Sequence, residues 1–435
     1  MDFLDYETYN QKLNELVKKD FPNPIKKEEP IAYTSCGFPV DHFKIGNGNK
    51  HITVMAGTHG TEIIGIDFVL KLMENIAKNK SLNKNFTIDF IPCQNPEGFI
   101  IVTMPLKKYI KDLEKDALKY YEAYKKDDIN IIKINKIIKD KEKIKEFWDK
   151  YRFEKTNTQT LEKFLNKQIE EDIEIDKEKY HYKIFENLSY KDLPEVNENY
   201  KKLKDKLQKI MEKDYDGYKF PKQSIIDFRA NASGVDLNKN NPQNLLVKKA
   251  ELKEESILFG ALRFNQIRRE VPGPQGATCQ NLEDFKFENE NIGLLKHLTK
   301  LRKEEKYFGA YSFHGTGGII YAKPLNYKQI EDKEKALKIK EIDDLNTKIA
   351  EEYEKITGYA TVDYPQKLTG TGDMLRQMFP GFILIELSKM GGNPLGPYGD
   401  RQNYQKVIKD NINAFNKIIE ITPNLNYNEH AKEMY

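Results

Sequence analysis

Cysteines are few in this sequence, and they form no recognisable pattern. Cys36, Cys93 and Cys279 are scattered along 435 residues. An odd number of cysteines without a Cys-x-x-Cys pair indicates neither a disulfide framework nor a thiolate zinc site. Proteins without a disulfide framework are typical of reducing compartments, and we therefore expect this protein to be cytoplasmic.

Long apolar runs are also lacking. No stretch approaches the roughly 20 apolar residues that a membrane-spanning helix needs. Residues 1–7 show neither the basic region nor the apolar segment of a secretory signal. The sequence thus predicts no membrane association.

An excess of charge of one sign is absent as well. The 71 Lys and Arg residues nearly balance the 68 Asp and Glu residues, so the chain as a whole produces no field that would attract nucleic acid. We expect no nucleic-acid partner. The length suffices for one large core, or for a core with one added module, and the sequence does not indicate an oligomeric state.

The most informative stretch is Ile52–Glu62. It begins as a short apolar run rich in β-branched residues, which predicts a buried strand, and an apolar helical pattern follows over Ile63–Ile76. His59 and Glu62 therefore lie at the carboxyl end of a strand, where open α/β sheets bind their ligands. An imidazole and a carboxylate three residues apart can share one zinc ion. The same spacing also fits a helix N-terminus at which Glu62 only complements the helix dipole.

Strand-like and helix-like stretches alternate around this turn. Phe86–Pro92 predicts the next strand, so that strand, helix and strand form a βαβ unit with a parallel pair. Later strands are predicted at Ser224–Phe228, Tyr307–Phe313, Ile319–Tyr321 and Phe382–Leu387. We predict an α/β fold with a central mixed, largely parallel β-sheet flanked by helices.

The stretch from about Leu106 to Tyr218 has a different character. It is dense in Lys and Glu, lacks strand-like runs and spaces its apolar residues at helical intervals. We predict that residues 106–218 form a helical insertion in a catalytic domain made of residues 1–105 and 219–435. Acidic residues interleaved with the basic ones favour a solvated charged surface over a nucleic-acid-binding arm.

Several short motifs occur in the order in which the zinc carboxypeptidase family carries them. They are His59-Gly60-Thr61-Glu62, Asn95-Pro96-Glu97-Gly98, Arg229 before Gly234-Val235-Asp236-Leu237-Asn238, Ser312-Phe313-His314, Tyr364 and Glu386. Taken together, these stretches resemble that family over about residues 30–104 and 220–425. The resemblance does not reach the helical insertion.

The resemblance implies a role for each matching residue. His59, Glu62 and His314 would bind one zinc ion per chain and leave a position open for water. Glu386 would act as general base toward that water and then donate the proton to the leaving amine. Arg229 would stabilise the oxyanion of the reaction. Glu386 could instead be a structural carboxylate paired with a basic side chain, and Arg229 an ordinary charge at a strand end.

The resemblance also implies residues that bind the substrate. Tyr364 lies 22 residues before Glu386 and matches a substrate-capping tyrosine of the family, although one of 25 tyrosines could fall there by chance. The family usually has Asn-Arg where this chain has Asn238 and Lys239. Because lysine offers a point charge and arginine a planar fork, we expect a free α-carboxylate to be bound less specifically. The other histidines are expected to be ordinary surface or core residues: His42, His51, His181, His297 and His430.

Three hypotheses about function follow. The leading one is a zinc metallopeptidase that removes a terminal or near-terminal residue from a peptide, with murein-derived peptides as one candidate substrate class. The second is an amidohydrolase of N-acyl amino acids that resembles the aspartoacylase and succinylglutamate desuccinylase group, which also carries a His-Gly-x-Glu turn. The third is a catalytically silent binding module that uses the insertion to hold a partner.

Overall fold

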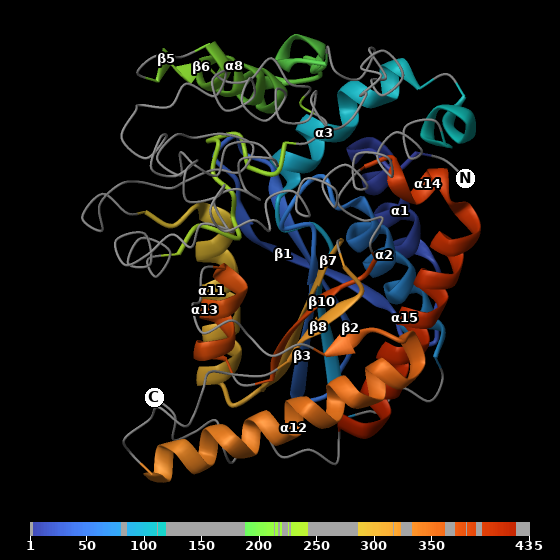
Figure 1. The fold of residues 1–435 in the computed structure, drawn as a ribbon, viewed down its shortest axis with the longest axis vertical. Coiled ribbons are helices and arrows are strands. Elements are labelled where there is room, and N and C mark those ends of the chain that lie inside the picture. The colour runs from blue at the N-terminus through green and yellow to red at the C-terminus, as the bar shows by residue number, and fades with distance from the viewer. Residues whose placement is uncertain are drawn as a thin grey trace, which may run out of the picture.

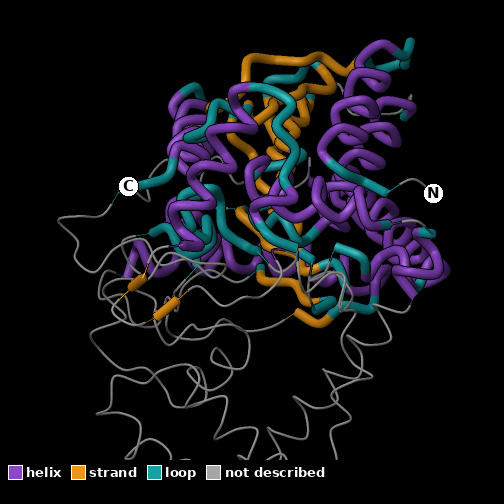
Figure 2. Tube along the Cα trace, turned by 90° about the horizontal axis from the view of Figure 1, so that it is seen from above, coloured by secondary structure: helices purple, strands orange, loops and turns teal. Residues whose placement is uncertain are grey.

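The computed structural model describes residues 3–79, 85–110, 112–118, 188–212, 214–215, 218–219, 225, 228–241, 286–315, 317–322, 333–361, 370–379, 381–388 and 394–422. These residues form a central sheet with helices on both of its faces (Figure 1). Seen from above, the strands run between two groups of helices (Figure 2). Among the described helices, none combines the length and the apolar character that crossing a membrane requires.

Eight strands form one mixed sheet in the order β1-β2-β4-β3-β7-β10-β8-β9. The strands are β1 (Ile25–Tyr33), β2 (Pro39–Gly46), β3 (Lys50–Ala56), β4 (Phe86–Ile91), β7 (Tyr307–His314), β8 (Ile319–Tyr321), β9 (Ala360–Thr361) and β10 (Phe382–Glu386). The central strands β4, β3, β7 and β10 are parallel to one another, whereas β2 joins β4 and β8 joins β10 in antiparallel pairs. The predicted fold class is therefore confirmed.

Helices cover both faces of the sheet, which is why its central strands are almost continuously apolar. One group consists of α1 (Tyr6–Lys18), α2 (Ile63–Lys78), α3 (Pro96–Tyr109), α12 (Lys333–Thr357), α14 (Gly396–Gly399) and α15 (Arg401–Ile421), and the other of α11 (Asn289–Lys303) and α13 (Thr371–Met378) (Figure 1). Side chains alternate between the faces along each strand. On β3, Ile52 and Val54 join the larger core with α2 and α15, while Met55 joins the smaller core with α11 and α13.

One predicted strand differs from the structure. The strand predicted at Ser224–Phe228 is wrong where the structure describes it. Ile225 and Phe228 lie in a turn closed by the bond from the Phe228 N–H to the Ile225 carbonyl (3.0 Å). Both side chains are buried, so this apolar run reflects core packing rather than strand pairing.

Much of the predicted insertion lies outside the described residues. Its described part contains the 3₁₀ helix η1 (Tyr190–Asp192), α8 (Glu198–Glu212) and a two-stranded sheet of β5 (Asp214–Tyr215) and β6 (Tyr218–Lys219), which is separate from the main sheet. Helix α8 packs on the main body, because Asn199 Nδ2 donates to the Gly37 carbonyl (3.1 Å). The predicted first residue, Leu106, lies inside α3, and the division into domains stays a prediction.

Candidate metal centre

The three predicted zinc ligands lie at the carboxyl ends of neighbouring parallel strands. His59 and Glu62 belong to the turn between β3 and α2, and His314 ends β7, which pairs with β3 in the sheet. All three side chains are buried, and their ligand atoms lie within 4.8 Å of one another. The parallel pairing thus brings together residues that are far apart in the sequence.

Both histidines direct Nδ1 at the carboxylate between them. His59 Nδ1 lies 2.8 Å from Glu62 Oε1, and His314 Nδ1 lies 3.2 Å from Glu62 Oε2. The Gly315 backbone N–H also donates to Oε2 (3.1 Å), which fixes the carboxylate. Two imidazoles and one carboxylate are a donor set found in catalytic zinc sites, where the fourth position stays open. The donor set therefore fits a zinc ion.

Asp236 is a further residue of the centre, to which the sequence analysis assigned no role. Its Oδ1 accepts from His59 Nε2–H (3.1 Å) and from the Asn238 N–H (2.8 Å). A histidine that binds a metal through one nitrogen commonly donates its other N–H to a carboxylate, which fixes the tautomer. Asp236 therefore holds His59 with Nδ1 turned to Glu62. The sequence does place Asp236 inside the Gly234–Asn238 motif, but it does not indicate that Asp236 contacts His59.

Opposing charges stabilise one another in this buried group. Burial and the Arg229 guanidinium lower the pKa of His59, but Glu62 and Asp236 outweigh them and raise it to about 9. Burial raises the pKa of Glu62, yet His59, Arg229 and a hydrogen bond from His314 together hold it well below its usual value. Glu62 is therefore a carboxylate at neutral pH, as a metal ligand must be.

The two residues with predicted catalytic roles flank the ligands. Arg229 Nη2 lies 3.0 Å from Glu62 Oε1 and 2.8 Å from His59 Nδ1, and its side chain is 25% exposed. Glu386 ends β10 and is paired in register with His314 on β7. The four strand residues before Glu386 are buried, whereas Glu386 itself is partly exposed. The carboxylate thus lies at the solvent-facing end of an otherwise buried strand.

The loop that carries Arg229 and Asp236 is anchored by the buried side chain of Glu97. Glu97 Oε2 accepts from the Ala232 N–H (2.8 Å), while Oε1 accepts from the Cys36 N–H (2.8 Å) and the Ser35 hydroxyl (3.0 Å). The Glu97 side chain is long enough to join α3 to two other segments. Its role is therefore structural.

A second buried carboxyl group, Glu290, lies close to Glu97. Asn231 Nδ2 donates to Glu290 Oε1 (3.3 Å) and to Glu288 Oε2 (2.7 Å). The carboxyl groups of Glu288 and Glu290 therefore both contact the loop that carries Arg229. Burial and the negative charge of Glu97 raise the pKa of Glu290 to about 8. This part of the loop therefore packs on a carboxyl group that takes up a proton more readily than an exposed one.

The turn with His59 packs directly on the N-terminus of α3. A Cβ atom on Gly60 would meet the Gly98 backbone carbonyl carbon at 2.1 Å, so a side chain cannot fit there. Asn95 caps α3 by accepting from the Gly98 N–H (2.8 Å), and its Nδ2 donates to the Thr58 carbonyl (3.3 Å). The Asn-Pro-Glu-Gly motif thus supports the turn that carries His59 and Glu62.

The predicted substrate-binding residues are only partly described. Asn238 and Lys239 follow Asp236 on the same loop, and both are partly exposed. The Asn238 carbonyl accepts from the Thr371 N–H (2.6 Å), which ties this loop to α13. Tyr364 lies outside the described residues. The structure therefore brings Asn238 and Lys239 to the loop beside the ligands and leaves the role of Tyr364 a prediction.

The comparisons with known proteins agree with this reading of the motifs. Residues 12–127 match the model of the zinc carboxypeptidase family. The match contains His59, Glu62 and Asn95–Gly98 and confirms the predicted resemblance over these residues, and it also extends past residue 104, where the predicted resemblance ended. Among curated proteins, no sequence matches this chain.

Solved structures similar to this chain include several carboxypeptidases. Bovine thrombin-activatable fibrinolysis inhibitor, in complex with tick carboxypeptidase inhibitor, has 12% identity and a TM-score of 0.46 over 97% of this chain and 98% of its own. Carboxypeptidase A from Helicoverpa armigera has 12% identity and a TM-score of 0.43 over 95% and 73%. Murein-tripeptide amidase from Escherichia coli O157 has 12% identity and a TM-score of 0.35 over 91% and 93%.

Proposed function

We propose that the protein is a zinc-dependent metallopeptidase of the carboxypeptidase type, which hydrolyses a terminal or near-terminal amide bond of a peptide. The observation that carries the proposal is the convergence of His59, Glu62 and His314 at the strand ends, with Glu386 beside His314 in register. A structural role alone would not require this donor set next to a partly exposed carboxylate. We propose one zinc ion in this centre.

The residues around the ligands divide the chemistry among them. Zinc, when bound, would polarise the scissile carbonyl and lower the pKa of water. Glu386 takes a proton from the attacking water and passes it to the leaving amine. Arg229 donates to the oxyanion that develops in the transition state. Asp236 keeps His59 in the tautomer that the centre needs.

The substrate end of the centre is proposed to lie along the loop after Asp236. Asn238 and Lys239 would bind the terminal carboxylate, with Tyr364 covering the substrate. A lysine ammonium attracts a carboxylate without the bidentate geometry of arginine, so internal positions close to the terminus are also accessible. Murein-derived peptides are a substrate class with such ends.

The insertion and the compartment complete the proposal. Helix α8 lies beside the loop with Arg229, since Lys206 Nζ donates to Ser233 Oγ (3.4 Å). We propose that residues 106–218 restrict access to the centre, a gating role rather than a chemical one. The cytoplasm is the proposed compartment, and the buried free thiols Cys36 and Cys93 are consistent with it.

The test is hydrolysis of a mixed panel by the zinc-loaded protein. The panel contains peptides with free and amidated C-termini, muropeptides and N-acyl amino acids, and mass spectrometry records the products. We expect release of C-terminal or near-terminal residues from peptides. Cleavage of N-acyl amino acids alone would favour the amidohydrolase, and no cleavage by fully zinc-loaded protein would favour the binding module.

The Glu386→Gln variant tests the assigned base. It should keep its zinc and its fold and lose at least about 10²-fold in kcat, because general-base catalysis typically contributes 10²–10⁴-fold. Glu15→Gln, the same change at an exposed position of α1, is the matched control and should be as active as the unmodified protein. Near-normal turnover by Glu386→Gln would mean that another group is the base.

A further inference from the structure

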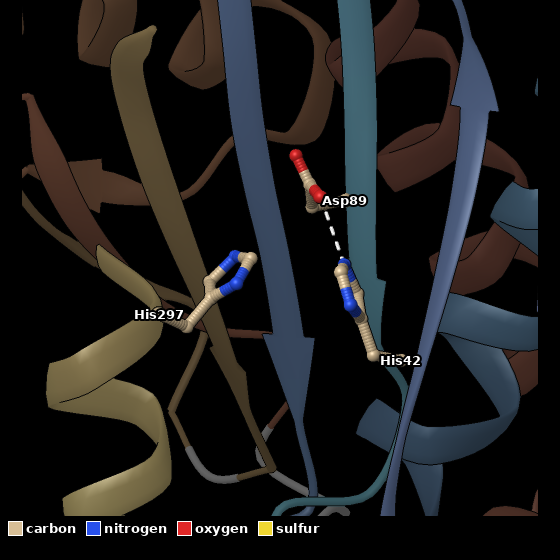
Figure 3. A group of neighbouring side chains, drawn as sticks. All are labelled: His42, Asp89 and His297. Atoms are coloured by element: carbon tan, nitrogen blue, oxygen red, sulfur yellow. Dashed lines mark hydrogen bonds and ion pairs between the residues drawn. The ribbon is translucent and has the colours of Figure 1, made fainter. Parts of the chain in front are cut away.

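A second group of metal-ligating side chains lies on the face of the sheet that α11 covers. His42 on β2, Asp89 on β4 and His297 on α11 each offer one ligand atom, and these atoms lie within 4.8 Å of one another. Figure 3 shows the His297 ring reaching from α11 toward Asp89 and His42. No residue of this group belongs to the centre at the strand ends.

Strand alternation explains why these side chains share a face. His42 lies two residues from Val40, and Asp89 two residues from Ile91, and both apolar residues belong to the core with α11 and α13. Since residues two apart on a strand point to the same side, His42 and Asp89 point toward α11. His297 completes the group from the helix that packs there.

The contacts within the group centre on one carboxylate. Asp89 is fully buried, with Oδ1 2.8 Å from His42 Nε2 and Oδ2 2.5 Å from His51 Nδ1. The rings of His42 and His297 meet edge to face, with centroids 4.8 Å apart. His297 Nε2 lies 3.4 Å from Thr53 Oγ1. Three imidazoles therefore lie around a single buried carboxylate.

Burial has opposite outcomes at two residues of this group, Asp89 and His297. Burial raises the pKa of Asp89, but hydrogen bonds from His42 and His51 hold it below its usual value, so the group is a carboxylate. Burial outweighs the attraction of Asp89 and lowers the pKa of His297 to about 4.

We propose that His42, Asp89 and His297 bind a second divalent cation, with zinc as the best match. Two imidazoles and a carboxylate suit zinc, whereas magnesium and calcium prefer sites made of oxygen atoms. His51 is a positioning residue, because its Nδ1–H holds Asp89 Oδ2, while Oδ1 faces the proposed ligand His42.

The second site is structural in character. His42, Asp89 and the neighbouring Thr53 are interior residues of β2, β4 and β3, whereas His59 follows the end of β3. The site therefore lies inside the layer between the sheet and α11, away from the strand ends. A cation held there would link β2, β4 and α11.

Zinc stoichiometry tests the proposal without any measurement of catalysis. Protein equilibrated with zinc and freed of excess ion should contain about two ions per chain. His314→Ala should contain about one, His297→Gln about one, and the double variant none. The matched control is Lys300→Gln, a change on the same helix at a side chain that is 74% exposed, and it should retain two.

Cobalt spectroscopy of the His314→Ala protein provides a second readout on folded material. We expect a visible absorption band typical of four-coordinate cobalt. Adding Asp89→Asn should abolish this band and leave the circular dichroism spectrum unchanged. A single zinc ion in the unmodified protein, lost completely in His314→Ala, would overturn the proposal. Unchanged stoichiometry in His297→Gln would overturn it as well. If the unmodified protein held a single zinc ion that His297→Gln lost and His314→Ala kept, this proposal would stand and the proposed peptidase would lose its basis.

Discussion

Replacing Asp236 with asparagine tests whether the carboxylate behind His59 tunes metal binding. Asparagine keeps the size of the side chain and an oxygen that can accept from the Asn238 N–H, so the loop should stay folded. The negative charge facing His59 Nε2, 3.1 Å away, is lost. A hydrogen bond to a charged group contributes about 1.5–3 kcal/mol.

The loss of metal affinity expected without Asp236 corresponds to a similar free energy. Removing the outer partner of a metal-binding histidine typically weakens metal affinity about 10–100-fold, which corresponds to about 1.4–2.8 kcal/mol. Because Asp236 is buried, little of this should be screened by solvent. We therefore expect Asp236→Asn to bind zinc at the strand-end centre about 10–100-fold more weakly.

Competition with a chelator of known zinc affinity measures the effect. Circular dichroism checks that the variant is folded. If the protein holds a second ion, the measurement is made in the His297→Gln variant, so that only the strand-end centre binds zinc. Asp205→Asn, which removes the same charge from an exposed position of α8, should bind zinc normally. A folded Asp236→Asn protein whose affinity stays within about threefold of the unmodified one would refute the reasoning.

Four other changes have defined outcomes. His314→Ala should lose one zinc ion per chain by elemental analysis, and full occupancy would remove His314 from the centre. Glu97→Ala strands three donors, two of them backbone groups, and should lower the free energy of unfolding in urea by about 3 kcal/mol or more; a loss below about 1 kcal/mol would contradict its anchoring role. The pKa of Glu290 is raised from 4.5 to about 8 in the folded state, so between these pH values the folded protein binds more protons than the unfolded one, and the free energy of unfolding falls as the pH rises. Glu290→Gln should reduce this fall by up to about 5 kcal/mol. The same dependence of stability on pH in the variant and the unmodified protein would count against the assignment. Replacing residues 106–218 by a Gly/Ser linker should widen the range of substrates if the product folds and binds zinc, whereas unchanged rates on large and small substrates would favour a partner-binding role.

Local patterns, together with the resemblance to the zinc carboxypeptidase family, allowed the strand-end centre to be predicted. His59 and Glu62 lie three residues apart in the sequence just after an apolar strand, and His314 ends a second apolar strand. The carboxyl ends of parallel strands meet at one edge of a sheet, so the convergence of these residues could be inferred without coordinates. Asp236 could not be assigned a partner in this way, because its contact with His59 depends on the path of an irregular loop.

The second histidine group could not be predicted from local patterns. The expectation that His42, His51 and His297 are ordinary residues followed from each being isolated in the sequence. Their meeting at Asp89 depends on β4 lying between β2 and β3, and on α11 crossing that face. Strand order is a property of the whole sheet. The wrong strand at Ser224–Phe228 has the opposite cause, since a short apolar run fits a buried turn as well as a strand.

The contact between Gly60 and the Gly98 backbone separates two kinds of constraint within one motif. In a library randomised at His59 and Gly60 and selected only for folded protein, position 59 should accept many residues, because the role proposed for its side chain is to bind the metal. Position 60 should return glycine alone, since any Cβ would come within 2.1 Å of the backbone. Selection for zinc binding would then narrow position 59 as well. The two neighbouring residues of the His-Gly-Thr-Glu motif are thus constrained for different reasons, His59 by metal binding and Gly60 by the lack of room for a side chain.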